Sequence, residues 1–258
     1  FGSVFAVTNV DWTQNGTFGF SNRVELAGSS VLRHAAGAAS GLRIEADSVA
    51  VASTASIDVS GRGDWPHVES SGAGGSYGGR GNYQTAQSCA TYGDYWNPDE
   101  LGSGGYGVVA GSSRGGGLVS IEAESLALDG AIRANGQAGP DYSGGGSGGG
   151  VCIRTEILTG GGSIQANGGA GGSSAGRAGG GGRVAVYYGE VSGFDLAAIQ
   201  CTGGEGGGAG TVFTQKTGNP SGRLVFDNEW RGHDSKIPTT LTITSNRFDQ
   251  LATPLVVE

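Results

Sequence analysis

The chain has 258 residues, of which 55 are glycine and only 15% are charged, yet 36% are hydrophobic. The hydrophobic residues come in short blocks that alternate with polar residues, a pattern typical of strands and not of disordered tracts or collagen. The net charge of −8 argues against a nucleic-acid partner, and no stretch of about 18 apolar residues is present to span a membrane. We therefore expect an all-β protein.

Residues 1–41 are predicted to form N-terminal strands that either cap the fold or make its first coil. Apolar residues alternate with others at 4–8 and at 17–20, and the Asn15-Gly16 pair between them is a turn signal. Asn15 also begins an Asn-Gly-Thr sequon, so it is the predicted site of N-glycosylation.

Residues 42–228 contain an internal repeat. The motif IDVSG at residues 57–61 recurs as IRANG, IQANG and IQCTG, which begin at Ile132, Ile164 and Ile199. A glycine-rich excursion follows each motif, and an apolar segment precedes it. These preceding segments are residues 42–46, 119–123, 151–155 and 184–188.

The repeat predicts how the chain stacks. Because side chains alternate along a strand, Ile57 and its equivalents share an apolar face, whereas Asp58 shares the opposite, polar face with Arg133, Gln165 and Gln200. Each repeat is too short to bury its own apolar face, so successive repeats must shield one another. We predict an all-β, right-handed parallel β-helix, or β-solenoid. Four unrelated hairpins with Asn-Gly turns are the alternative.

The longest glycine-rich excursion, residues 62–117, is a Gly/Tyr insertion with two tryptophans and five tyrosines. Glycine loses more backbone entropy on ordering than other residues, so such segments become ordered only where their amides are bonded. We expect the excursions to lie side by side as polyproline-II-like segments on one flank of the fold. Mobile linkers are the alternative.

Residues 229–258 are predicted to form C-terminal strands that start a further coil or repeat. Apolar residues alternate with threonine at 241–244, and the sequence ends in an apolar stretch. This pattern favours a repeat that belongs to a longer array.

Aromatic side chains of the insertion are the candidates for ligand binding. Trp65, Tyr92, Tyr95 and Trp96 have the rigid rings that stack on sugars at little cost in entropy. The competing interpretation is that these rings pack the insertion onto the rest of the fold.

Acidic residues give two further candidate sites. Asp94, Asp99 and Glu100 form the densest acidic patch and are the candidate Ca²⁺ ligands, although they lack the regular spacing of a known calcium loop. Glu45 and Glu122 occupy equivalent positions, and Arg154 and Tyr187 follow at the same position in the next two repeats. We interpret this row as a solvated ladder of charges and not as a catalytic pair, so no enzyme is predicted.

Three cysteines match no zinc-binding or redox spacing. Cys201 falls on the apolar face and is predicted to be a buried thiol. Cys152 falls on the opposite face, within reach of the long insertion. We therefore predict a Cys89–Cys152 disulfide that tethers this insertion.

The ordered motifs SIDVSGRG, LDGAIRANGQAG, GSIQANGGAG, AGGGGRVAVYY and GRLVFDN run through residues 42–228. They resemble the glycine-rich β-solenoid repeat modules of very large secreted or cell-surface proteins. The resemblance implies an extracellular or cell-surface location and a structural or adhesive role, and it brings no catalytic residues with it.

The sequence thus predicts a structural or adhesive module of an extracellular filament or giant cell-surface protein. Its expected partners are itself or adjacent repeats, end to end, and a surface polysaccharide. The alternative is a carbohydrate-binding or polysaccharide-degrading β-helix domain. No cofactor other than Ca²⁺ is expected.

Overall fold

The computed structural model describes residues 4–67, 72–83, 88–107, 111–172 and 177–229, together with the backbone of residues 256–257. The described residues form strands, irregular segments and one short 3-10 helix, Leu196–Ala198. Most of the predicted C-terminal region, residues 230–255, lies outside the described residues.

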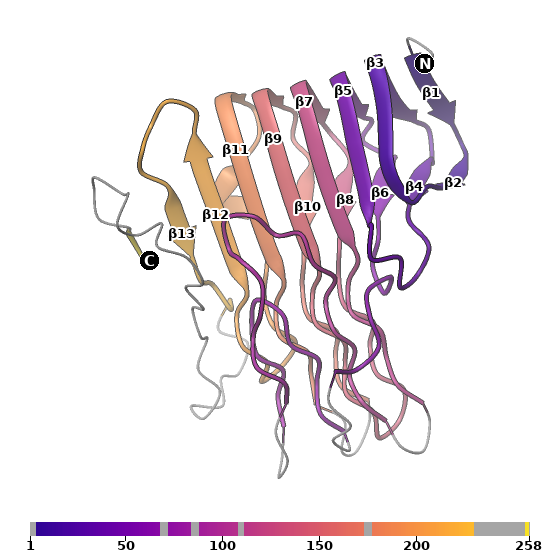
Figure 1. Cartoon of the computed structure of the whole chain (residues 1–258), viewed down its shortest axis with the longest axis vertical. Helices are drawn as coiled ribbons and strands as arrows, with labels where there is room; N and C mark the ends of the chain where they lie inside the picture. Colours follow the sequence, from indigo (N-terminus) through magenta and orange to yellow (C-terminus); the bar gives the residue numbers. More distant parts are fainter. Residues whose placement is uncertain are drawn as a thin grey trace.

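The strands form two sheets, and each of the first three repeats contributes one strand to each sheet (Figure 1). The fourth repeat contributes a strand to the larger sheet and a single bridge residue, Gln200, beside the smaller one. The larger sheet has the order β1 (Val4–Thr8), β3 (Gly16–Ala27), β5 (Leu42–Val51), β7 (Leu118–Leu128), β9 (Gly150–Thr159), β11 (Arg183–Ser192), β12 (Thr211–Lys216), β13 (Arg223–Val225) and β14 (Val256–Val257). The smaller sheet has the order β10 (Ser163–Gln165), β8 (Ala131–Arg133), β6 (Ser56–Asp58), β4 (Val31–Arg33) and β2 (Asp11–Thr13).

The repeat motifs pair in register, as their sequence columns indicate. Ile57 pairs with Ile132, and Ile132 pairs with Ile164, in parallel strands of the smaller sheet. A parallel bridge between Gln165 and Gln200 continues the column to the repeat of Ile199. These pairings exclude the alternative of four separate hairpins.

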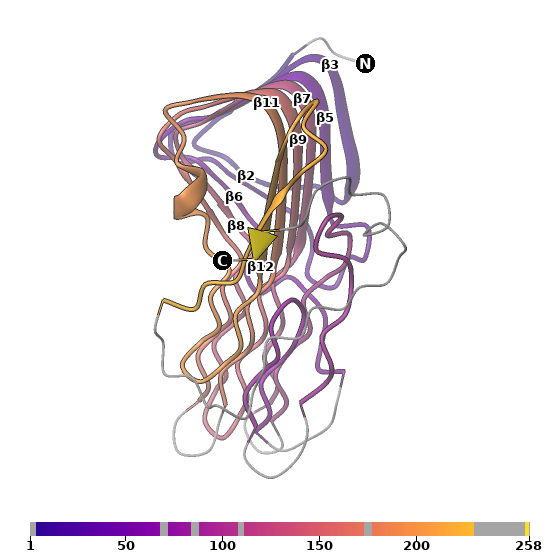
Figure 2. The same ribbon diagram turned by 90° about the vertical axis from the view of Figure 1, so that its left-hand side faces the viewer.

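The predicted right-handed parallel β-helix, or β-solenoid, is corrected by the sheet topology. The described strands form two open sheets of unequal size that do not close on one another, and the larger sheet is mixed because β13 runs antiparallel to β12. The prediction assumed that strands continue around each repeat and close it into a coil. Instead the backbone leaves the smaller sheet after each isoleucine motif and enters glycine-rich segments without strands, so the sheets stay open on that side (Figure 2).

The apolar core lies between the two sheets. In the first half of β5 the buried side chains, such as Ile44, lie at even-numbered positions. In the second half, such as at Val49, they lie at odd-numbered positions, although the strand is continuous. Two apolar segments that look separate in the sequence therefore belong to one strand, and both face the core. The smaller sheet, together with the segment around Gln200 that continues it, covers the other side of the core. Its buried column consists of Leu32, Ile57, Ile132, Ile164 and Ile199.

The glycine-rich excursions form a layer of extended segments below the sheets (Figure 2). Their backbones bond to one another: Gly75 N–H donates to Gly145 O at 2.9 Å, and Gly145 N–H donates to Arg177 O at 2.8 Å. These bonds show that the described parts of the excursions are tethered and are not free linkers. We call this set of segments the glycine layer; it consists of the described residues within 62–117, 136–149, 168–182 and 203–210.

The glycine layer joins the sheets at the same place in every repeat. The glycine before each long strand donates its N–H to the carbonyl two residues after the leading isoleucine. The donor and acceptor pairs are Gly117 and Val59, Gly149 and Ala134, Gly182 and Ala166, and Gly210 and Cys201, with N–O distances of 2.8, 2.7, 2.7 and 2.7 Å.

Polar side chains also connect the repeats at the corners that follow the smaller sheet. Asn135 Oδ1 accepts from the N–H of Asn167 at 2.8 Å, and Asn167 Oδ1 accepts from the N–H of Thr202 at 2.9 Å. The side chain of each asparagine in an Asn-Gly corner therefore bonds to the backbone of the next repeat.

A buried histidine ties the beginning of the chain to the end of the long insertion. His34 is fully buried, and its Nε2 accepts from the N–H of Leu118 at 3.0 Å. Its Nδ1 donates to Ala35 O at 2.8 Å, so both ring nitrogens are used by the neutral ring. Burial lowers the pKa of His34 below its ordinary value of 6.5, and the nearby charge of Arg62 lowers it further.

The close packing of the glycine layer predicts that the stability of the protein depends strongly on single glycines. A Cβ on Gly148 would stand 1.9 Å from Ala166 O, whereas a Cβ on Gly161 would meet no atom within 4 Å. We expect Gly148→Ala to reduce the free energy of unfolding by about 1–3 kcal/mol, because the neighbouring backbone must move. Gly161→Ala is the matched control, expected within about 0.5 kcal/mol of the wild type. Equal denaturant midpoints for the two variants would contradict the close packing.

His34 predicts a pH-dependent stability. Because its pKa is lowered in the folded state, the unfolded chain binds the proton first, and the free energy of unfolding falls as the pH drops below about 6.5. In His34→Gln, whose side-chain oxygen still accepts from Leu118, this part of the pH dependence is expected to vanish. Urea unfolding of both proteins between about pH 5 and 7 measures the difference. His67→Gln, which changes an exposed histidine, should retain the wild-type slope.

Candidate functional site

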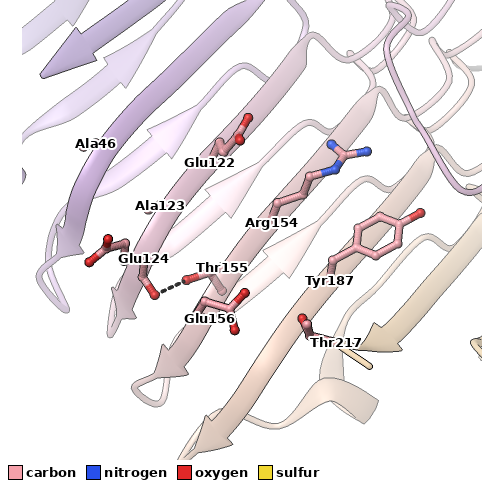
Figure 3. Close-up of a pocket in the computed structure, with 9 residues that line it drawn as sticks. All are labelled: Ala46, Glu122, Ala123, Glu124, Arg154, Thr155, Glu156, Tyr187 and Thr217. Atoms are coloured by element: carbon pink, nitrogen blue, oxygen red, sulfur yellow. Dashed lines mark hydrogen bonds between the residues drawn. The ribbon is translucent and has the colours of Figure 1, made fainter. Parts of the chain in front are cut away.

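A groove of about 470 Å³ crosses the outer face of the larger sheet, on the side away from the core (Figure 3). Its floor is made by neighbouring strands, mainly β7, β9 and β11. The groove is lined by Ala46, Glu122, Ala123, Glu124, Arg154, Thr155, Glu156, Tyr187 and Thr217.

Strand register places the polar side chains of the groove in a row. Glu45 pairs with Glu122, Glu122 with Arg154, and Arg154 with Tyr187 in successive parallel strands. The predicted ladder of charges is therefore present. Because side chains alternate between the two faces of a strand, these residues share the outer face of the sheet. The continuation of the row to Tyr187 follows the predicted column, and what the sequence did not reveal is that the row lines a groove.

The long insertion fixes the two largest side chains of the groove. Arg154 donates from Nη2 to Asn97 Oδ1 at 2.9 Å, and its guanidinium lies 5.0 Å from the ring centroid of Tyr187. The Tyr187 hydroxyl donates to Trp96 O at 2.6 Å. Both side chains are thus held in position by other parts of the protein, which lowers the entropy lost when a ligand binds to them.

The groove combines three carboxylates with one guanidinium and one phenol ring (Figure 3). Glu122 and Glu124 lie on β7, and Glu156 lies on β9. Thr155 Oγ1 donates to the backbone carbonyl of Glu124 at 3.2 Å, so this hydroxyl is already used within the fold. The carboxylates provide acceptors for hydroxyl or amine groups, and the ring of Tyr187 provides an apolar surface.

The four aromatic residues predicted to bind a ligand do not form one exposed surface. Tyr95 is buried, and its ring centroid lies 5.4 Å from that of Phe213 on β12. Trp96 is half-buried against the same aromatic cluster, and the Tyr92 hydroxyl donates to Leu101 O at 2.7 Å. Tyr95 and Trp96 thus pack the insertion against the larger sheet, whereas the Tyr92 side chain bonds within the insertion.

Trp65 alone among the four is strongly exposed. The guanidinium of Arg114 lies 4.0 Å from its ring centroid, within the glycine layer. Trp65 therefore presents an aromatic ring to solvent on a different part of the molecule from the groove.

The predicted Ca²⁺ ligands do not converge. In the part of the chain that the structure describes, no group of three or more His, Cys, Asp or Glu side chains is arranged to hold a metal ion. Asp99 instead accepts from Asn97 Nδ2 at 3.2 Å, and it lies next to Glu100 on an exposed turn. Burial raises the pKa of Glu100, and the nearby charge of Asp99 raises it further. A calcium site formed by Asp94, Asp99 and Glu100 is therefore not supported by the geometry.

The predicted Cys89–Cys152 disulfide is not formed, and all three cysteines are free. Cys89 Sγ lies 3.6 Å from Ser103 Oγ within the glycine layer. Cys152 is buried on β9, where Arg154 Nη1 donates to its Sγ at 2.8 Å. The insertion is held by aromatic packing and hydrogen bonds in place of a covalent tether. Cys201 is buried in the core, as predicted, and burial raises its pKa.

Asn15, the predicted glycosylation site, lies at an exposed position immediately before β3. Its Oδ1 accepts from the N–H of Ala35 at 2.8 Å, which connects the turn to the segment after β4.

Comparison of the chain with protein-family models, curated proteins and solved structures found no significant match. Among the described residues, no helix has the length and apolar character needed to cross a membrane. The function is therefore inferred from the geometry of the chain itself.

Proposed function

We propose that the chain is a structural and adhesive module of an extracellular filament or large cell-surface protein, which associates with further repeats end to end. The observation that supports this proposal is the edge of the stack at β1 and β2. Within the described residues, β1 pairs only with β3, and β2 pairs only with β4. Unpaired edges of this kind are templates for the addition of another strand.

Apolar side chains accompany this free edge. Trp12 on β2 is 41% exposed, and its ring centroid lies 5.8 Å from that of Phe5 on β1. Phe5 in turn contacts Phe18 and Phe20 at centroid distances of 4.7 and 5.4 Å. A further repeat placed against this end would cover Trp12 and Phe5 and would satisfy the free backbone groups of both strands.

The opposite end of the stack has a different structure. There β13 runs antiparallel to β12, so the parallel order of the repeats stops at β12. The two ends are thus not equivalent, and the β1–β2 end is the one that continues the parallel order. For this chain on its own, the added repeat comes from a second copy.

Trp12→Lys is the test of this association. A lysine at the end of the core places a charge where the next repeat must pack, so the variant is expected to stay monomeric at concentrations where the wild type assembles. Sedimentation velocity over a range of concentrations measures the difference. Ile157→Lys is the matched control, because Ile157 is 47% exposed but lies on β9 in the middle of the larger sheet. It should assemble like the wild type.

Two results would contradict the proposal. The first is a wild-type chain that remains monomeric at all concentrations and shows no filaments by electron microscopy. The second is assembly that Trp12→Lys leaves unchanged while its circular dichroism spectrum stays that of the folded wild type.

A carbohydrate-binding role is the second candidate, and the outer groove is the observation that favours it. The groove offers an immobilised Tyr187 ring beside acceptors and a guanidinium, the combination that binds sugar hydroxyl groups and ring faces. Three carboxylates against one guanidinium favour a neutral or amine-bearing sugar chain over an acidic one.

Titration calorimetry with neutral and amine-bearing oligosaccharides tests this second role. We expect Glu122→Gln to weaken the binding of an amine-bearing chain about tenfold, because a charge-assisted hydrogen bond is lost. Glu190→Gln is the control: this carboxylate is also exposed and lies on β11, but it does not line the groove. Equal affinity in both variants, or no binding by the wild type, would contradict a sugar site in the groove.

A further inference from the structure

A fully buried arginine lies beneath the long insertion. Arg183 is the first residue of β11, in register with Gly150 of β9, which pairs in turn with Leu118 of β7. Its side chain is 0% exposed. Arg183 thus stands at the register position where the two preceding repeats have Gly150 and Leu118.

Two of the three guanidinium nitrogens of Arg183 are satisfied. Nε donates to Tyr92 O at 2.9 Å, and Nη1 donates to Thr211 Oγ1 at 3.3 Å. Nη2 is buried and has no hydrogen-bond partner. Since Tyr92 belongs to the insertion, the guanidinium connects the insertion to β11 and β12.

A second orphaned donor lies beside it. Tyr77 is also 0% exposed; the backbone N–H of Glu100 faces its hydroxyl oxygen, but the hydroxyl proton has no acceptor. The guanidinium carbon of Arg183 lies 5.5 Å from the centroid of the Tyr77 ring. Two buried donors without acceptors thus occur in one small region between the insertion and the larger sheet.

The charge of Arg183 is not matched by an ion pair. Asp94 and Glu100 are near enough to favour its charged form, but no carboxylate of the described residues makes an ion pair with it. A guanidinium stays protonated in proteins, and an unpaired buried charge is destabilising. A water molecule would satisfy the orphaned donors but would not compensate the charge.

We propose that a small inorganic anion of the halide type binds between Arg183 and Tyr77. Nη2 of Arg183 and the hydroxyl of Tyr77 donate to it, and its charge balances the guanidinium. The anion thereby stabilises the docking of Tyr77 and of the insertion residues around Tyr92 on the larger sheet. This site is independent of the association at β1 and of the outer groove.

The first test compares thermal unfolding in sodium chloride, bromide and gluconate at constant ionic strength. Because the anion binds only the folded state, the melting temperature is expected to rise with halide concentration and not with gluconate. Arg183→Gln is expected to abolish the halide effect. Arg114→Gln is the matched control, since it also removes a guanidinium that lies over an aromatic ring, and it should keep the halide effect.

Tyr77→Phe gives a second, milder test. In gluconate the variant is expected to be at least as stable as the wild type, because it removes an unsatisfied buried hydroxyl. In chloride it is expected to be less stable than the wild type, because it removes a donor to the anion. Identical differences from the wild type in both salts would overturn the proposal.

Bromide soaked into crystals of the wild-type chain identifies the ion directly. The expected result is an anomalous difference peak within hydrogen-bonding distance of Arg183 Nη2 and Tyr77 Oη. Density for a water molecule without an anomalous peak, or a halide effect that survives in Arg183→Gln, would overturn the site.

Discussion

The close approach of glycine backbones is the constraint on which the rest of the structure depends. Gly116, Gly148 and Gly181 precede successive long strands, and a Cβ on any of them would stand 1.9 Å from the carbonyl oxygen of Ala134, Ala166 or Cys201 respectively. Each of these carbonyls accepts the N–H of a glycine in the following repeat, from Gly149, Gly182 and Gly210 respectively. Sheets and glycine layer are therefore aligned by one repeated contact, which no other residue type permits. This explains why a chain so rich in glycine is ordered despite the entropy that each glycine loses.

Side chains with long-range contacts then attach the insertion to this framework. His34 bonds to Leu118, 84 residues later, and Arg183 bonds to Tyr92, 91 residues earlier. Tyr95 and Trp96 pack on the aromatic cluster of β11 and β12. Since the same contacts orient Arg154 and Tyr187, the insertion both covers part of the outer face and shapes the groove beside it. A covalent tether is not needed for this arrangement.

The proposed association and the proposed sugar binding both depend on surfaces that these features form. The repeated contacts produce a stack in which, among the described residues, β1 and β2 form a free parallel edge, and this edge supports the proposed end-to-end association. The groove lies on a flat outer face where adjacent strands place their polar side chains at regular spacing. The two roles are compatible, because the edge and the groove are formed by different strands.

The sequence by itself determined the repeat, the in-register columns of Ile57, Ile132 and Ile164, and the row from Glu45 to Arg154. These follow from the two-residue period of a strand, which depends only on neighbouring residues. Only the tertiary structure decided that the sheets stay open, that Cys89 and Cys152 lie in different surroundings, and that Asp94, Asp99 and Glu100 do not converge. It alone brought Arg183 beneath Tyr77. Such outcomes depend on contacts between residues far apart in the chain, and glycine-rich segments have no side-chain pattern from which their neighbours can be predicted.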